Sequence, residues 1–252
     1  MKYTDNEFLI CQSARLVEDK KNIFMGFGIP QIVAYLAKML YAPNSNIIYE
    51  YGAVGAQLAL PYVRGTMADS RNNHASFWFT NMSTVSGLVA LGYMDYGFIG
   101  ALQVDPHGNT NATYVRGRRI GGAGGANIMT GMCKRTVIVL KHEERRFREK
   151  LDFATSPGVT SGNLNREYAG LPVNAGAWRV VTSMALFDFE EKSTRMRLIG
   201  VSPKYTVKEV LDNMGFEPIV AENVKTLEPP TEKELQLLRE KIDPERAIIG
   251  ED

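Results

Sequence analysis

The sequence contains few residues of the kinds that cross-link a chain or bind metal ions. Its 252 residues include two cysteines and three histidines. Cys11 and Cys133 are far apart, so they form neither a disulfide framework nor the close pairs of a zinc site. We therefore expect no metal site, and the scarcity of cysteine fits a reducing compartment.

An excess of one charge and long apolar runs are also lacking. The formal net charge is +1, which gives no electrostatic reason to expect binding to nucleic acid or to a membrane surface. We interpret the basic clusters at residues 116–119 and 145–148 as solvated faces rather than phosphate sites. No run reaches the roughly 18 apolar residues that span a bilayer. Because the opening MKYTDNEF has no apolar signal segment, we expect a cytoplasmic protein.

The chain does have enough apolar residues for a sizeable core, with 44% hydrophobic residues. Short apolar runs of strand length alternate with helical patterns. This alternation predicts an α/β fold with a mostly parallel open sheet. Neither an internal repeat nor a low-complexity linker divides the chain, so we predict a single domain over residues 1–252. The predicted strands are 23–25, 47–50, 96–104 and 136–140, and the predicted helices begin at Thr4 and cover 31–40 and 126–132.

The last third has a different pattern. Residues 179–189 and 196–201 resemble paired strands around a polar turn, and a short helix is predicted at 207–214 with Thr206 as its cap. Thr231 and Glu234 have the spacing of a capping box, as do Thr4 and Glu7, so a final helix should run to about residue 242.

Three glycine-rich breaks follow predicted strands, at residues 26–30, 52–55 and 121–125. In open α/β sheets, ligands bind outside the carboxyl ends of the strands, and glycine lets backbone N–H groups approach them closely. None of the breaks has the spacing of a Walker A loop or of a dinucleotide fingerprint. The breaks are either tight turns alone or the cradle of an oxyanion or a pantetheine-like chain.

One carboxylate, Glu50, closes an apolar strand beside the second break. An acid at such a place is either an ordinary solvated strand end or a partly desolvated nucleophile. Side-chain alternation directs Tyr49 and Tyr51 away from Glu50, which favours a packing role for both tyrosines.

Three segments together resemble the β subunit of class I (family I) CoA-transferases, and most of all that of glutaconate CoA-transferase. They are Met-Gly-Phe-Gly-Ile-Pro at 25–30, Tyr-Glu-Tyr-Gly at 49–52 and Gly-Ala-Gly-Gly-Ala-Asn at 122–127. Segments at 103–109, 134–147 and 152–158 look similar too, and the resemblance covers roughly residues 5–220. It implies a three-layer α/β/α sandwich of the NagB/RpiA/CoA-transferase-like kind.

The resemblance also implies a covalent reaction. Glu50 matches the family glutamate that attacks an acyl-CoA thioester and then carries a glutamyl-CoA thioester. Coenzyme A is thus a substrate and part of the covalent intermediate, and no cofactor is bound permanently. The residues implied in CoA and oxyanion binding are Gly26, Gly28, Ile29, Gly122, Gly124, Gly125 and Ala126.

A separate α subunit is implied as partner, in an αβ or α2β2 assembly, because the family divides its active site between two chains. Acyl-CoA and a carboxylic acid are the implied substrates. After the glutamate the family usually has Ser-Gly or Asn-Gly, whereas this sequence has Tyr51-Gly52. Tyr51 and Gly52, with His74 and His142, are further candidates for the cleft; the bulky Tyr51 leaves the choice of acid open.

Two other functions are alternatives to CoA transfer. An acyl-CoA hydrolase or ring-opening hydrolase would use the same subunits, and a non-catalytic ligand-binding module would use a related sheet. A regulator of the latter kind usually carries a helix-turn-helix segment, and no free region suits one. A purely structural subunit would not need Glu50.

Overall fold

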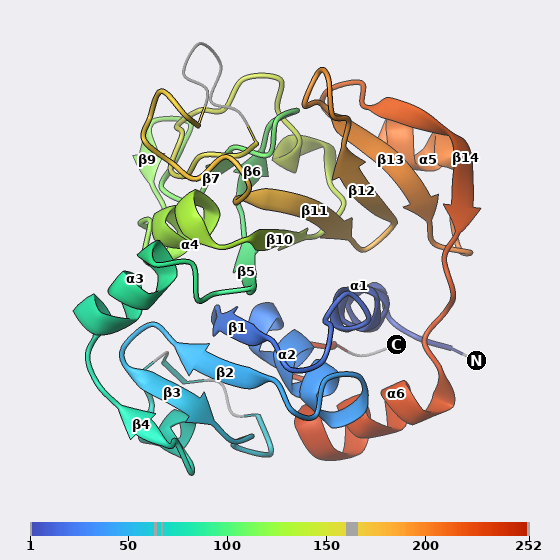
Figure 1. Ribbon diagram of the computed structural model, residues 1–252. Helices are drawn as coiled ribbons and strands as arrows, with labels where there is room; N and C mark the ends of the chain where they lie inside the picture. Colours follow the sequence, from blue (N-terminus) through green and yellow to red (C-terminus); the bar gives the residue numbers. More distant parts are fainter. Residues whose placement is uncertain (1, 63–64, 67, 160–165, 251–252) are drawn as a thin grey trace.

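A ten-stranded mixed sheet forms the centre of the molecule in the computed structural model, which describes residues 2–62, 65–66, 68–159 and 166–250 (Figure 1). The strand order is β14-β13-β12-β11-β10-β5-β1-β2-β3-β4. Five of its nine strand pairings are parallel, including the central run β11-β10-β5-β1-β2. The strands are β1 (Asn22–Met25), β2 (Asn46–Tyr49), β3 (Ala53–Ala56), β4 (Trp78–Phe79), β5 (Tyr96–Gly100), β10 (Arg135–Leu140), β11 (Ala177–Thr182), β12 (Ala185–Phe189), β13 (Met196–Val201) and β14 (Ile219–Thr226).

The central strands are apolar on both sides because both faces of the sheet are covered. Along β10, Val137 and Val139 join the core on one face, whereas Ile138 and Leu140 join the core on the other. The chain therefore buries near-continuous apolar runs instead of alternating polar and apolar residues.

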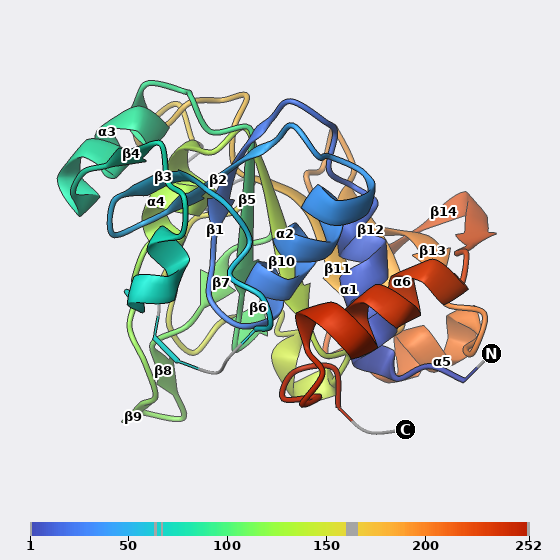
Figure 2. The same ribbon diagram turned by 90° about the horizontal axis from the view of Figure 1, so that it is seen from below.

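Helices cover the two faces and complete three layers, as the sequence predicts. Helices α1 (Asp5–Ala14) and α2 (Ile29–Leu40) lie on one face with α6 (Glu232–Gln236), which continues as the π-helical segment η3 (Leu237–Ile242). Helices α3 (Met82–Ala90), α4 (Ala126–Met132) and α5 (Val207–Asp212) supply Val85, Met129 and Val210 to the core on the other face. Figure 2 shows α1, α2 and α6 grouped on one side and α3 and α4 on the other.

The three capping residues that the sequence predicts are all present. Thr4, Thr206 and Thr231 each accept a hydrogen bond from the amide three residues on, and the glutamate at that position bonds back. Such caps satisfy amides that have no partner inside the helix.

Two predicted strands are each divided in the structure. The predicted strand 179–189 is a hairpin of β11 and β12, because Thr182 Oγ1 accepts hydrogen bonds from the amides of Met184 and Ala185 and turns the chain. The predicted strand 96–104 is β5 followed by β6 (Gln103–Val104), which leaves the main sheet to pair with β7 (Thr110–Asn111). A further small hairpin joins β8 (Tyr114–Val115) to β9 (Arg118–Arg119).

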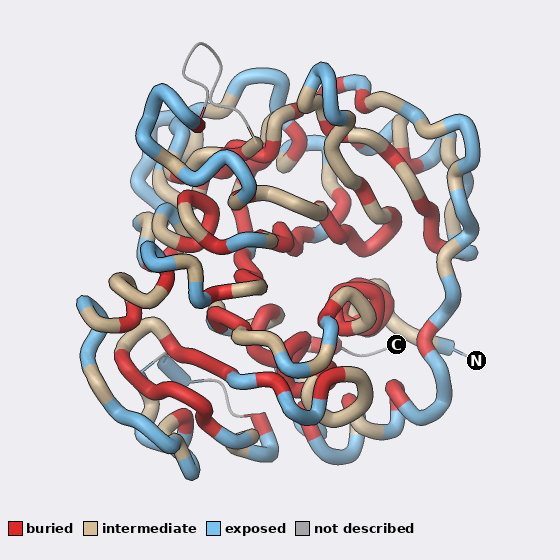
Figure 3. Tube along the Cα trace, in the orientation of Figure 1, coloured by how far each residue is buried: buried red, intermediate tan, exposed pale blue. Residues whose placement is uncertain are grey.

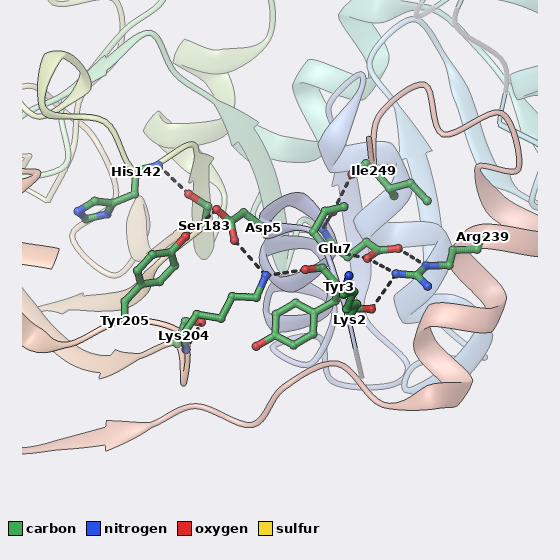
Figure 4. A network of polar contacts seen from close by, with 12 residues as sticks. Lys2, Tyr3, Asp5, Glu7, His142, Ser183, Lys204, Tyr205, Arg239 and Ile249 are labelled. Carbon is green, nitrogen blue, oxygen red and sulfur yellow. Dashed lines mark hydrogen bonds and ion pairs between the residues drawn. The ribbon is translucent and has the colours of Figure 1, made fainter. Parts of the chain in front are cut away.

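The two ends of the described chain are tied to each other. Thr4 Oγ1 donates a hydrogen bond to the carbonyl of Ile249 (2.7 Å), and Asn6 donates to Ile248 (2.8 Å). Arg239 on η3 forms an ion pair of 2.6 Å with the fully buried carboxylate of Glu7 (Figure 4). The last segment thus holds α1 against α2.

No helix within the described ranges is both long enough and apolar enough to cross a bilayer.

Candidate functional site

Glu50 lies directly after β2, at the edge of the sheet where the parallel strands end. Met25 at the end of β1 is paired with Tyr49 at the end of β2, so the Gly26 loop and Glu50 leave the sheet side by side. The chain then turns sharply, and the Gly52 amide donates to the Tyr49 carbonyl (3.1 Å). Gly52 has a φ of 132°, and a Cβ there would come within 2.2 Å of the Thr80 carbonyl oxygen. Only glycine fits this turn.

The Glu50 carboxylate lies against the third glycine-rich break. A Cβ built on Gly125 would be 2.9 Å from Glu50 Cδ and 3.0 Å from each carboxylate oxygen. Gly125 is buried and caps the start of α4. Across the described ranges, no hydrogen bond or ion pair to the Glu50 carboxylate is formed. Two of the breaks, at 52–55 and 121–125, therefore meet at a half-buried acid whose oxygens no side chain neutralises.

The first break joins β1 to α2. Gly28 has a φ of 77°, and the space where its side chain would be is empty. Gly26 approaches β5 so closely that a Cβ would be 2.5 Å from the Phe98 carbonyl oxygen. The adjacent Ile29 begins α2, with Pro30 in its first turn. The backbone at Gly28 is thus open toward the edge from which Glu50 projects.

The outer part of the third break is exposed. Gly122 and Gly124 have nothing near the positions of their absent side chains, and Gly124 has a φ of 50°. Ala126, half-buried, donates its amide to the carbonyl of Ala123 and starts α4. The loop can therefore present backbone to a ligand above Glu50 while Gly125 stays beneath the carboxylate.

The tyrosines that flank Glu50 lie on the α2 side, as side-chain alternation predicts. The rings of Tyr49 and Tyr51 are 5.7 Å apart, and Tyr51 also contacts Phe79 at 6.1 Å. Tyr51 donates a hydrogen bond to Asn73 Oδ1 (2.6 Å), and burial raises the pKa of Tyr51 to about 12. Both phenols stay protonated and fix the chain on either side of the glutamate.

Sequence reasoning missed a buried polar cluster behind Glu50. Gln31 Nε2 on α2 donates to the hydroxyls of Tyr35 (2.9 Å) and Tyr49 (3.3 Å) and to Asn72 Oδ1 (3.0 Å). The two tyrosine hydroxyls are 3.1 Å apart. The spacing of Gln31 and Tyr35, one turn apart on an apolar helix, is the only sequence signal that could have suggested this cluster.

His74 is exposed at the end of the short helix η1 (Ser70–Asn73). It lines a surface cavity of about 300 Å³ with Leu58, Leu60, Pro61 and Arg71. The structure places it beside the α2 side of the site, without a hydrogen bond or ion pair between its ring and Glu50.

His142 does not join Glu50. The strands β5 and β1 separate β10, which it follows, from β2. Its ring packs on Phe147 (4.8 Å), Nδ1 bonds with Thr182 Oγ1 (3.0 Å), and Nε2 donates to the Val210 carbonyl (2.9 Å). Burial lowers the pKa of His142 to about 4, so the imidazole is neutral at pH 7. His142 therefore belongs to the core on the α5 side, and we leave it out of the site.

A hollow of about 890 Å³ beside His142 is separate from Glu50. Its walls are the N-terminal residues 2–6, the ends of β10 and β11, Lys204 and the C-terminal Ile249 (Figure 4). There, Lys204 Nζ donates a hydrogen bond to the carbonyl of Tyr3 and lies over the Tyr3 ring. Because the Glu50 loops do not line it, this hollow plays no part in the candidate site.

The remaining reactive side chains do not suggest another catalytic centre. Burial raises the pKa of the Cys11 and Cys133 thiols, so neither is a ready nucleophile. The described residues contain no group of three or more His, Cys, Asp or Glu that could hold a metal ion.

The sequence and the fold of this chain both match one family of known proteins. The model of the Coenzyme A transferase family matches residues 10–213. The chain belongs to the coenzyme A transferase family.

Several known proteins are similar in sequence or structure to this chain. The B subunit of glutaconate CoA-transferase from Acidaminococcus fermentans is 34% identical over 98% of this chain and 95% of that protein. The crystal structure of that glutaconate CoA-transferase matches with a TM-score of 0.89 and 32% identity, over 100% of both chains. The B subunit of 3-oxoadipate CoA-transferase from Pseudomonas knackmussii is 33% identical over 94% of this chain and 92% of that protein. A cholesterol ring-cleaving hydrolase IpdB subunit of Rhodococcus jostii is 30% identical, over 58% of each.

Proposed function

We propose that this chain is the β-type subunit of a heteromeric CoA-transferase, which moves CoA from an acyl-CoA to a free carboxylic acid through a thioester on Glu50. The observation that carries the proposal is the position of the Glu50 carboxylate, beside two glycine-rich loops and unpaired within the described residues. Full-length similarity to the B subunits of two CoA-transferases supports it.

In the proposed reaction, a Glu50 oxygen attacks the thioester carbonyl, the carbon–sulfur bond breaks, and CoA leaves as the thiolate. The resulting acyl-glutamyl anhydride is attacked by the thiolate at the glutamyl carbonyl, which releases the first carboxylic acid and leaves Glu50 as its CoA thioester. An acceptor carboxylate attacks that thioester, and the thiolate then attacks the acceptor's acyl carbon. The new acyl-CoA departs and the Glu50 carboxylate is restored.

Each attack creates an oxyanion, and each intermediate hydrolyses if water reaches it. Backbone amides around Gly26, Gly28 and Ile29 are the proposed donors on one side of Glu50. Those around Gly122, Gly124, Gly125 and Ala126 are the donors on the other. Tyr51, Gly52 and His74 are the residues proposed to border the entrance on the α2 side, where Tyr51 would limit the width of the acid. Coenzyme A is the only cofactor required, and the cytoplasm is the expected compartment.

A companion α subunit completes the proposed enzyme as αβ or α2β2. Both CoA-transferase relatives carry the letter B in their names, as one of the lettered subunits of their enzymes. The acids in those names support a dicarboxylic or 3-oxo acid as substrate class.

The test is to trap the thioester. The heteromer is incubated with acyl-CoA without acceptor, and the peptide containing residue 50 is examined by mass spectrometry for a CoA adduct. Borohydride should then reduce the adduct and abolish transfer. Glu50→Gln should lower kcat by at least about 10⁴-fold, since no other group replaces a nucleophile. The exposed Glu191→Gln serves as the matched control and should keep full activity.

The alternative hydrolase gives a different result. It would release free CoA from acyl-CoA as fast without acceptor as with it. Full activity after borohydride, or a kcat for Glu50→Gln within a few fold of wild type, would rule out the proposed covalent role.

A further inference from the structure

The surface formed by residues 75–94 differs from the rest of the molecule in its lack of charge. These twenty residues, Ala-Ser-Phe-Trp-Phe-Thr-Asn-Met-Ser-Thr-Val-Ser-Gly-Leu-Val-Ala-Leu-Gly-Tyr-Met, contain no Asp, Glu, Lys, Arg or His. At the chain average of 23% charged residues, a segment of this length would carry about four or five charges. We call residues 75–94 the neutral segment.

Burial does not explain the lack of charge in the neutral segment. It contains β4 and α3, and α3 buries only Val85 and Val89. Figure 3 shows exposed residues along β4 and at both ends of α3, at the margin of the molecule. Its large apolar side chains that face solvent are Phe77 (68% exposed), Phe79 (59%), Met82 (55%), Leu91 (75%), Tyr93 and Trp78.

The outward face of α3 lacks the charged residues that a solvated helix carries. An ordinary surface helix has charged side chains opposite its apolar stripe. Outside Val85 and Val89, α3 offers methionine, serine, threonine, glycine, leucine and alanine. Adjacent to it, β4 pairs with β3 alone and ends the sheet, which leaves one of its edges open within the described ranges. Depletion of charge together with aromatic residues marks the core of protein–protein interfaces.

This surface is continuous with the Glu50 site. The Thr80 amide donates to the Gly52 carbonyl (2.9 Å), and the Phe79 ring contacts Tyr51. Helix α3 also packs beside α4, whose first residues border the Glu50 carboxylate. A chain docked on β4 and α3 would therefore reach the open side of Glu50.

We propose that the neutral segment is the surface on which the α subunit docks, and that docking there closes the Glu50 site. The proposal rests on the heteromeric function proposed above. A charged partner or nucleic acid would have no complementary charge to bind on this surface. The α subunit is the partner chosen because the surface adjoins the half-buried Glu50 carboxylate, and because both relatives are named as lettered subunits.

The test uses the full chain and its α-type companion chain. Met82→Lys and Leu91→Lys each place a charge on the neutral segment at a solvent-facing position, so the fold should tolerate both. Phe77 is avoided because its ring packs on Gly55. Val220→Lys, at the opposite end of the sheet on β14, introduces the same charge at an exposed apolar position and is the matched control.

Each lysine on the neutral segment should raise the Kd for the α subunit about tenfold or more, whereas Val220→Lys should leave it unchanged. In wild type, amides of residues 75–94 should exchange hydrogen more slowly in the heteromer than in the free chain. A heteromer whose Kd neither variant changes, with no protection of 75–94, overturns this inference alone. If wild type forms no heteromer, the heteromeric function fails with it. If the variants abolish self-association instead, the surface joins copies of this chain and the α subunit is the wrong partner.

Discussion

At the scale of single residues, Glu50 could be predicted and its surroundings could not. Its place follows from the apolar strand before it and the glycine after it, both readable in the sequence. The contact with Gly125 joins positions 75 residues apart and depends on how α4 meets β2, which no local pattern encodes. His142 shows the opposite case: it follows a strand at the predicted edge, but its ring contacts Phe147, Thr182 and Val210 and not Glu50.

Gly125→Ala should impair chemistry without unfolding the chain. Gly125 has a φ of −78°, which alanine adopts freely, so the backbone is not strained. The added methyl would be 2.9 Å from Glu50 Cδ and must displace the carboxylate. We expect kcat to fall about 10²-fold, the usual effect of misplacing a reacting group by about 1 Å. Gly131→Ala in the same helix, where the nearest contact would be 3.8 Å, should keep its activity and thermal stability.

His142 should make the protein less stable in mild acid. Its folded pKa of about 4 is below the ordinary value of 6.5 because of burial, so the unfolded chain binds a proton that the folded chain does not. The contribution of His142 to the free energy of unfolding is therefore greatest above pH 6.5. It falls as the pH drops toward 4, by about 2 kcal/mol between pH 7.5 and 5. Urea unfolding of His142→Phe at both pH values should show a smaller difference than wild type. An equal difference would assign the acid sensitivity to other groups.

At the scale of elements, capping boxes and apolar runs predicted most helices and strands correctly. Helix α3 and the strands β3, β4 and β14 were not predicted, and a local side-chain hydrogen bond explains one further exception. Thr182 turns what reads as one strand into β11 and β12, and hydroxyl turns of this kind have no distinctive sequence spacing. The Gln31 cluster depends likewise on Tyr49 and Asn72 arriving from other elements.

Helix α6 depends on the buried acid Glu234. Burial opposes its ionisation, but hydrogen bonds from Arg15, Thr231 and Tyr41 outweigh burial and lower the pKa of Glu234. Its carboxylate is 2.6 Å from Arg15 Nη2 and fully buried. Glu234→Gln should cost about 3–5 kcal/mol of unfolding free energy at pH 7, because Arg15 loses its counter-charge.

The loss should depend on pH in a defined direction. The pKa of Glu234 is lower in the folded chain than in the unfolded chain, where it is near 4.5. Ionised Glu234 therefore stabilises the fold above pH 4.5, and this stabilisation is lost as the pH falls through the folded pKa. The difference in stability between wild type and Glu234→Gln should therefore be smaller at pH 3 than at pH 7. The exposed Glu232→Gln on the same helix is the control and should match wild type at both pH values.

At the scale of the whole molecule, the α/β class followed from alternation along the chain and the three layers from the family resemblance, whereas the strand order followed from neither. A ten-stranded order that runs from β14 to β4 is fixed by contacts between distant segments. The same holds for the neutral segment: its lack of charge is visible in the sequence, but a charge-free stretch of this length is equally typical of a buried helix and strand.

The complete enzyme is expected to need two chains. Purified alone, this chain should transfer CoA at least about 10³-fold more slowly than with its α subunit, because water reaches the open side of Glu50 and hydrolyses the intermediates. The measurement is acyl-CoA formation with acceptor, alongside release of free CoA. Equal transfer rates for the single chain and the heteromer would contradict a divided site.

The tie between the two ends of the chain has a consequence for synthesis on the ribosome. Helix α1 is made long before Arg239, Ile248 and Ile249, which bind its polar groups. Glu7 precedes Arg239 by 232 residues, so at roughly 5–20 residues per second it waits about 12–46 seconds for its counter-charge. During that time the nascent chain carries an α1 whose acid has no counter-charge, and α1 takes its final place only after Arg239 has been made.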